Sequence, residues 1–308
     1  MNAFSVVDHV LVLFLLMGMG LLLSAVHFVN EEGERQISRI LCYLVSPCLI
    51  LNSFQMQFSS SAASAFLAAA LAAAGIHLGS ALLGAVLFRR KKLGERAAVM
   101  QFATTYSNCG FMGLPILQTI GGQMGVFLGT AYIGVFNLFC WTHGIGLYGG
   151  KVGPADLRRV FANPNIVAIA VSLVLFFGRI TLPAPLREGI GYVAQINTAL
   201  AMILVGTQLA GARVRELVGS LQVWAVVGLR NLFLPLALLA VLFAAGVRGT
   251  LLMCCVLPVA CPAASYTVIF AQLSDRETRF PVEIVTLSTL LSVVTLPLIA
   301  MAVSGLAG

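Results

Sequence analysis

Charged residues are scarce in this sequence of 308 amino acids. They make up 9% of the chain, whereas hydrophobic residues make up 59%. An ordinary soluble domain is roughly 25% charged, and a soluble fold could not hide so much apolar surface. The apolar runs recur from end to end and are continuous rather than alternating, which indicates membrane-spanning helices and not barrel strands. We therefore predict an all-α membrane protein, with residues 1–308 forming a single domain in the lipid bilayer.

Motifs for catalysis and metal binding are absent as well. There is no GxSxG or HExxH motif and no pair of aspartates in the apolar runs, so the nucleophile and base that an enzyme needs are missing. The seven cysteines lie in apolar segments without CxxC or Cys/His metal spacing, as small apolar fillers do. We expect no enzymatic activity, no cofactor and no bound metal.

Ten transmembrane helices are predicted from the apolar runs. Their ranges are 6–29, 37–55, 64–88, 97–120, 125–149, 163–180, 188–211, 221–246, 249–273 and 281–305. The loop between the fifth and sixth spans divides the chain into a first five-helix repeat, 1–150, and a second, 160–308. An odd number of spans in each half means that the second half enters the membrane with inverted orientation.

Lysine and arginine are concentrated in alternate loops. One side of the predicted bundle carries Arg35, Arg39, Arg89, Arg90, Lys91, Lys92, Arg96, Lys151, Arg158, Arg159, Arg213, Arg215, Arg276 and Arg279, and the other only Arg179, Arg187 and Arg248. By the positive-inside rule the first side is cytoplasmic. The formal charge of +7 thus reflects topology and not a nucleic-acid partner. We expect a bacterial inner (plasma) membrane protein with both termini on the non-cytoplasmic side.

Two spans in corresponding positions of the two halves are predicted to break near their middles. The fourth contains TTYSNCGFMGLPILQTIGG, with Gly110, Gly113 and Pro115, and the ninth contains VLPVACPAASYTVIF, with Pro258 and Pro262. A proline removes a backbone donor and clashes with the carbonyl four residues earlier. In a membrane such breaks are tolerated where they are buried in protein or line a wet cavity, so the matched pair predicts a binding site at the repeat interface.

An anionic ligand would suit such breaks. Pro115 and Pro262 are each expected near the first turn of a second half-helix. The N-termini of these half-helices would offer free N–H donors and partial positive charge to the cavity. A simple proline kink without a ligand is the alternative.

The segment Asn108-Cys-Gly-Phe-Met-Gly-Leu-Pro115 resembles the Asn-x-x-x-Met-Gly-x-Pro crossover of the auxin efflux carrier family. Plant PIN-type auxin carriers and bacterial malate or malonate permeases belong to this family, within the bile acid/auxin carrier superfamily. Further matches are Gly121-Gly122, Asn137 with Trp141-Thr142, Asn163-Pro164-Asn165, Pro258-x-x-x-Pro262 and Leu296-Pro297. The resemblance covers essentially the whole chain.

The resemblance implies an architecture and a mechanism. Spans one, two, six and seven would form a scaffold, and the other six would form a transport domain that moves like an elevator. Substrate would bind beside the broken crossover helices 4 and 9.

Several polar and backbone-permissive residues are candidates for substrate binding. Asn108 can both donate and accept hydrogen bonds, so it could bind a carboxylate, although a structural helix cap is the alternative. Asn52 and Gln208 occupy comparable places in the two halves and could face the crossovers, or could bond helix to helix. The full set is Asn108, Cys109, Gly110, Gly113, Pro115, Pro258, Pro262, Ser265, Asn52, Asn137 and Gln208.

Coupling and charge have three further candidates, His77, Thr104 and Arg230. His77 lies near the middle of the third span and could couple transport to protons, although a neutral histidine bonded between helices is the commoner case. Arg230 lies about nine residues into the eighth span, and we interpret it as an interfacial anchor rather than a functional cation. No Asp or Glu lies deep in a span, which excludes a carboxylate relay. The coupling ion, H⁺ or a Na⁺ held by groups such as Thr104, Asn137 or Ser265, stays open.

The function that these features predict is secondary transport. We expect an efflux or uptake carrier for a small organic anion such as a carboxylate or an auxin-like weak acid. A channel or membrane receptor for a small solute is the alternative, since broken helices can also line pores. Oligomeric state is left open, with a homodimer as one option.

Overall fold

The structure is a computed structural model that describes residues 3–149, 153–210 and 220–307. Lys151, Arg213 and Arg215, the ends of the predicted domain and repeats at 1, 150 and 308, and the end of the seventh predicted span at 211 lie outside the described residues. Within them the chain is almost entirely helical and forms no strand. The all-α prediction is therefore confirmed.

The helices follow the apolar runs. Their bounds are α1 Ala3–Ala25, α2 Glu31–Ile40, α3 Ser46–Ser53, α4 Ser60–Leu87, α5 Arg90–Leu93, α6 Arg96–Thr105, α7 Leu114–Phe139, α8 Ile145–Leu147, α9 Pro154–Phe161, α10 Pro164–Phe177, α11 Ala184–Ala210, α12 Leu221–Gly228, α13 Leu234–Ala244, α14 Gly249–Ala260, α15 Tyr266–Leu273 and α16 Arg279–Ala307. π-Helical turns lie at Leu41–Val45, Cys109–Gly113, Cys140–Gly144 and Leu229–Phe233.

Five helical stretches are long and apolar enough to cross a membrane. They are Ser60–Leu87, Cys109–Leu147, Ala184–Ala210, Leu221–Ala244 and Arg279–Leu306, and three shorter apolar helices cover Leu11–Ala25, Pro164–Phe177 and Gly249–Ala260. Large apolar side chains are exposed on their outer faces, for example Leu71, Leu82 and Val174. Such faces require lipid around them, so the chain is a multi-pass membrane protein.

Local sequence explains where the helices begin. Asn30 Oδ1 accepts a hydrogen bond from Gly33 N at 2.9 Å, and Ser59 Oγ accepts one from Ala62 N at 3.1 Å. Asn163 caps α10 in the same way, through Asn165 N at 2.9 Å. Each cap accepts a hydrogen bond from a backbone N–H group in the first turn, which has no acceptor within the helix.

Three of the π-helical turns are explained by prolines. Pro47, Pro115 and Pro235 each follow such a turn and lie in the first turn of the next α-helix. The residue four positions earlier is then Tyr43, Phe111 or Asn231, inside the π-helical turn. The wider turn accommodates the clash between the proline ring and that carbonyl.

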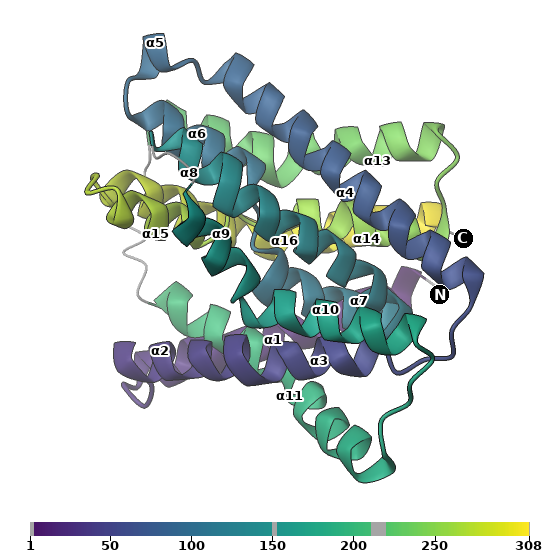
Figure 1. The fold of residues 1–308 in the computed structure, drawn as a ribbon. Helices are drawn as coiled ribbons and strands as arrows, with labels where there is room; N and C mark the ends of the chain where they lie inside the picture. The colour runs from purple at the N-terminus through teal and green to yellow at the C-terminus, as the bar shows by residue number, and fades with distance from the viewer. Residues whose placement is uncertain (1–2, 150–152, 211–219, 308) are drawn as a thin grey trace.

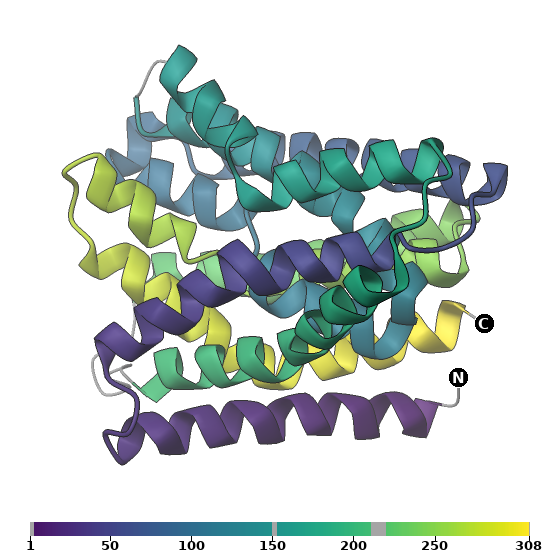
Figure 2. The same cartoon turned by 60° about the horizontal axis from the view of Figure 1, so that its bottom comes forward.

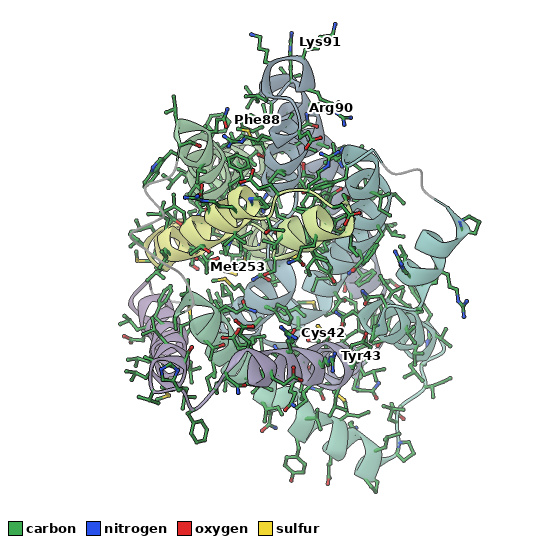
Figure 3. The ribbon with its side chains drawn as sticks, turned by 90° about the vertical axis from the view of Figure 1, so that its left-hand side faces the viewer. Cys42, Tyr43, Phe88, Arg90, Lys91 and Met253 are labelled. Atoms are coloured by element: carbon green, nitrogen blue, oxygen red, sulfur yellow. The ribbon has the colours of Figure 1, made fainter. Side chains whose placement is uncertain are left out.

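Both chain ends lie at one end of the bundle, and α2, α5 and α15 reach the opposite end (Figures 1 and 2). The basic residues of α2, α5 and the turn between α15 and α16 therefore share an end. In Figure 3 that end faces the viewer, and Arg90 and Lys91 stand on α5 at its tip. The loops that carry Arg179 and Arg248 lie at the end of the chain termini.

The packing forms two groups of helices. α11 packs along α1 and α3, and α10 packs on α3. In the other group, α7 packs on α4 and α14, while α14 also packs on α13 and α16. Contacts between α1 and α16 and between α11 and α7 connect the groups.

The stretch Cys109–Leu147 reverses direction at Gly122, where φ is 57° and ψ is −147°. Residues after the turn lie against residues before it, since a Cβ on Gly125 would sit 2.4 Å from Leu117 O. Side chains are strongly disfavoured in this backbone region.

Replacing Gly122 by alanine is expected to lower the free energy of unfolding by about 1–3 kcal/mol, because a Cβ strains this turn. The matched control is Gly121→Ala, where the added Cβ would only touch Thr250 Cγ2 at 3.7 Å in a helix. Thermal unfolding in detergent compares the two. Equal stability of both variants would contradict the account of this turn.

Candidate substrate site

The two predicted breaks lie directly against each other. Helix α6 ends at Thr105 and the next helical turn begins at Cys109, while α14 ends at Ala260 and α15 begins at Tyr266. Ser107 and Ala263 form an antiparallel bridge. Asn108 N donates to Pro262 O at 2.8 Å, and Ala264 N donates to Tyr106 O at 3.0 Å. The segments thus satisfy each other's backbone groups inside the protein, as non-helical chain at membrane depth must.

One of the two prolines of the site lies differently from the prediction. Pro262 is in the extended break, four residues before α15, where the backbone of Cys261 has φ −63° and ψ 150°. That conformation is typical of a residue before proline, so Pro262 does not begin the second half-helix. Pro115 lies in the first turn of α7, as predicted, directly after the π-helical turn Cys109–Gly113.

Arg230 lies at the C-terminal ends of α6 and α14. Its Nη1 donates to Thr104 O at 2.8 Å and its Nε donates to Cys261 O at 3.3 Å. The side chain is 1% exposed, so the interpretation of Arg230 as an interfacial anchor is wrong. The guanidinium faces two helix C-termini, where the partial charge is negative.

The neighbouring residue, Asn231, contacts the place where the two breaks lie against each other, here called the crossing, through Ser288 of α16. Asn231 Nδ2 donates to Ser288 O at 2.7 Å, and Ser288 Oγ donates to Asn231 Oδ1 at 2.7 Å. Ser288 Oγ also accepts from Ala263 N at 2.9 Å. Two consecutive residues of the π-helical turn before Pro235 thus hold the crossing, and π-helical turns are frequent at functional sites.

A cavity of about 250 Å³ lies beside the crossing. It is bounded by the starts of both second half-helices, by α2 and α3 with the turn between them, by α7 and by the start of α10. The polar or small residues that line it include Ser38, Cys42, Ser46, Ser107, Asn108, Cys109, Gly110, Asn137, Asn163, Asn165, Ala264 and Ser265, and the aromatic ones are Tyr43, Phe111, Phe136 and Tyr266. Cys42 and Tyr43 are labelled in Figure 3.

The structure brings five of the predicted substrate-binding residues to this cavity: Asn108, Cys109, Gly110, Asn137 and Ser265. Asn108 is half-buried, and its side chain makes no capping hydrogen bond to the turn that follows. The structural-cap alternative for Asn108 is therefore wrong. Its backbone N–H and carbonyl are bonded to Pro262 O and Met112 N, and the residue lines the cavity.

The side-chain amide of Asn137 is engaged in hydrogen bonds within the protein. Its Nδ2 donates to Ile133 O at 2.9 Å, and its Oδ1 accepts from Asn163 Nδ2 at 3.1 Å. Asn163 in turn caps α10. Asn137 therefore joins α7 to α10 at the cavity wall.

The remaining predicted residues lie outside the cavity wall. Gly113 allows close packing on α14, since its Cβ would stand 3.7 Å from Cys261 Sγ and 3.8 Å from Pro258 Cα. Pro115 is buried in α7, where its carbonyl accepts from Thr119 Oγ1 at 2.8 Å. Asn52 lies in the last turn of α3, next to Gly191 of α11, so its predicted place at the crossovers is wrong.

His77 and Thr104 are fully buried. His77 Nδ1 lies 2.8 Å from Ala73 O, and the ring packs among Tyr106, Tyr132, Phe136 and Phe139. Of the groups proposed for Na⁺, the Thr104 carbonyl is occupied by Arg230. Among the described residues, no group of three or more His, Cys, Asp and Glu side chains could hold a metal ion.

Gln208 lies elsewhere, in a wider hollow of about 1500 Å³ at the basic end. Residues Ser38, Ser265 and Ile269 border both this hollow and the cavity. Its charged lining is Glu31, Glu34, Arg35, Arg39, Arg279 and Glu283. Burial raises the pKa of the Glu34 carboxyl above its ordinary value, although a hydrogen bond with Thr207 opposes the rise.

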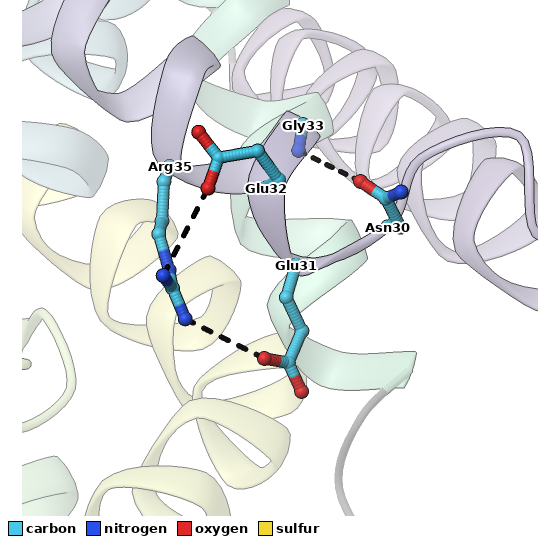
Figure 4. Close-up of polar contacts among 5 residues, drawn as sticks. All are labelled: Asn30, Glu31, Glu32, Gly33 and Arg35. Atoms are coloured by element: carbon cyan, nitrogen blue, oxygen red, sulfur yellow. Dashed lines mark hydrogen bonds and ion pairs between the residues drawn. The ribbon is translucent and has the colours of Figure 1, made fainter.

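Ion pairs order the rim of this hollow. Arg35 contacts Glu31 at 3.6 Å and Glu32 at 3.8 Å, beside the cap that Asn30 forms (Figure 4). Arg279 contacts Glu283 at 3.1 Å. The pairs of Arg35 are exposed, so they contribute little stability.

Sequence reasoning missed the contribution of α2 and α3 to the cavity. Ser38, Cys42 and Ser46 recur every four residues along one continuous helix, with Tyr43 next to Cys42, and this spacing is a helical face. That spacing could have predicted that α2 and α3 contribute to the cavity. Asn163 and Asn165 were noticed only as part of the resemblance.

Similarity to known proteins identifies the family of this chain. The chain matches the family described as membrane transport protein in two stretches, residues 5–151 and 150–300. It is 26% identical over 305 residues, 97% of each chain, to an uncharacterized transporter of Methanothermobacter thermautotrophicus. It is 23% identical over 215 residues, 66% of this chain and 68% of the relative, to an uncharacterized transporter of Methanocaldococcus jannaschii.

A plant protein shows the same likeness over a shorter part. The chain is 29% identical over 119 residues to a probable auxin efflux carrier component of Oryza sativa subsp. japonica, which is 37% of this chain and 20% of the plant protein. The resemblance and the prediction that the protein is not an enzyme are thus confirmed. The chain belongs to the membrane transport protein family, which includes the auxin efflux carriers, and is a transporter.

Proposed function

We propose that this protein is a secondary carrier of a small organic anion, which binds in the cavity beside the crossing of the two breaks. The observation that carries the proposal is the convergence of both second half-helices on one cavity, with Asn108, whose side chain makes no capping hydrogen bond, on its wall. About 250 Å³ is below the roughly 300–1,000 Å³ of pockets for drug-sized ligands, which favours a small solute such as a carboxylate.

The charge of the surroundings favours an anion. Asn108, Cys109 and Gly110 open one half-helix, and Ser265 and Tyr266 open the other. First-turn N–H groups and the helix dipole attract negative charge. The described residues of the cavity wall include no Asp or Glu that would repel a carboxylate.

The architecture that we propose has ten transmembrane helices in two inverted repeats of five. The two family matches, one in each half, support this division. α1, α2 with α3, α10 and α11 would form the scaffold, and the packing of α11 on α1 and α3 agrees with it. Elevator-type movement of the other helices, which carry both breaks, would expose the cavity alternately to the two sides.

We propose the bacterial inner membrane as the location, with the termini on the non-cytoplasmic side. The gathering of basic residues at the end of α2, α5 and α15 supports this sidedness. The hollow at that end, which borders the cavity through Ser38 and Ser265, would then be the cytoplasmic access route. Whether H⁺ or Na⁺ drives transport is tested by the experiment that follows.

Uptake into proteoliposomes tests the proposed function. Radiolabelled malate, malonate and indole-3-acetate are offered with sodium and pH gradients imposed separately. Saturable uptake of one acid that unlabelled acid competes away is the expected result, and the gradient that drives it identifies the coupling ion. Failure of every acid under every gradient would refute the anion assignment and favour a neutral solute.

A further inference from the structure

Arg230 carries a buried positive charge that no acidic side chain of the described residues pairs with. Its side chain is 1% exposed, and no ion pair to it is found among the described residues. Two of its nitrogens donate to the carbonyls of Thr104 and Cys261, and Nη2 has no hydrogen-bond partner in the described part of the chain. The carbonyl contacts satisfy hydrogen bonding only in part and leave the net charge in place.

A charge left unpaired in a low-dielectric interior is costly. The C-terminal ends of α6 and α14 offset part of this cost through their dipoles. The rest stays as a positive potential inside the protein, where water screens it poorly. An interior cation of this kind therefore attracts any anion that reaches a nearby cavity.

The cavity lies within range of that potential. Thr104, which accepts from Arg230, precedes the cavity-lining Ser107 by three residues. Three residues of chain span at most about 10 Å. The guanidinium therefore lies near the cavity, although Arg230 does not itself line it.

We propose that Arg230 is the specificity-determining residue for ligand charge: it acts through the crossing, without touching the substrate, and makes the cavity selective for anions. This inference rests on the proposed function. A unit charge about 10–15 Å away, at an effective dielectric constant near 20, changes the affinity for a monoanion roughly tenfold. The effect on a dianion should be about the square of that, roughly a hundredfold, and a neutral ligand should feel almost nothing.

The experiment compares acids with their uncharged amides in binding to purified protein. The probes are indole-3-acetate with indole-3-acetamide and malonate with malonamide. Arg230→Gln removes the charge but keeps a hydrogen-bond donor, and Arg230→Lys keeps the charge. Arg248→Gln removes an exposed arginine at the far end, and Ser288→Ala loosens the crossing without changing any charge.

Arg230→Gln is expected to weaken indole-3-acetate binding roughly tenfold and malonate binding roughly a hundredfold, with amide binding changed less than twofold. Arg230→Lys and Arg248→Gln should keep the preference for acids. Ser288→Ala should affect acid and amide equally. If Arg230→Gln is not recovered folded, Thr104→Asp provides the test, because it adds a negative charge at the residue whose carbonyl binds the guanidinium.

Three outcomes are informative. Loss of acid binding that grows with ligand charge supports the inference. Equal loss for acid and amide, or unchanged acid binding in the charge-removing variant, overturns it while the proposed function stands. Wild-type protein that binds neither acid refutes the proposed function and the inference with it.

Discussion

Replacing Asn108 by aspartate is expected to abolish binding of small organic anions while the protein still folds. Asn108 lines the cavity, and its side chain makes no capping bond to the helix that follows. The substitution keeps the shape and places a negative charge on the cavity wall. Two like charges about 4 Å apart at an effective dielectric constant near 20 repel by about 4 kcal/mol, which exceeds a hundredfold in affinity.

Two comparisons separate this effect from damage to the fold. Asn108→Ala removes the amide without adding charge, so it should weaken binding less. Asn52→Asp adds the same charge at the far end of α3, away from the cavity wall, and should weaken binding far less than Asn108→Asp. Binding is measured on purified protein together with thermal unfolding. Undiminished affinity of Asn108→Asp for every acid that the wild type binds would place the site elsewhere.

Replacing Gly206 by alanine is expected to lower the free energy of unfolding by about 3 kcal/mol or more. Gly206 of α11 faces Gly20 of α1, and a Cβ on Gly206 would stand 2.0 Å from Met17 O and 3.0 Å from Gly20 Cα. The obstructing atoms are backbone, so the two helices would have to separate. Small residues allow this kind of close approach between membrane helices.

Gly18→Ala is the matched control for that prediction. It lies two residues from Gly20 in the same helix, and a Cβ there meets nothing within 4 Å. Since alanine is the better helix former, this variant should be as stable as the wild type or slightly more so. Thermal unfolding of both variants in the same detergent compares their stabilities. Similar midpoints would mean that α1 and α11 do not pack closely at Gly20 and Gly206.

The fold class could be predicted from the sequence because composition and run length leave few options for so apolar a chain. The predicted ranges of the third and tenth spans, 64–88 and 281–305, lie close to α4 at Ser60–Leu87 and α16 at Arg279–Ala307. The positions of the helix breaks followed from glycine and proline. The π-helical turns before Pro47, Pro115 and Pro235 did not, since a proline predicts a disturbance of the helix but not its form.

The site could be predicted only near the breaks. Asn108 and Ser265 follow from the motifs themselves, whereas Asn52 and Gln208 were chosen from symmetry between the halves and lie away from the crossing. The prediction for Arg230 was wrong because its position along one helix indicates its depth in the membrane but not which residues of other helices it contacts. Its acceptor Thr104 is 126 positions away in the chain, and such a contact exists only once the helices pack.

Counterflow in proteoliposomes tests the central claim, that the cavity beside the crossing binds the anion for alternating access, most directly. Vesicles are loaded with the unlabelled acid that the uptake experiment identifies and diluted into trace labelled acid without any ion gradient. A carrier with this site predicts transient accumulation of label above equilibrium, absent with Asn108→Asp and present with Asn52→Asp. Passive equilibration without accumulation in the wild type, as a channel would give, would contradict the account.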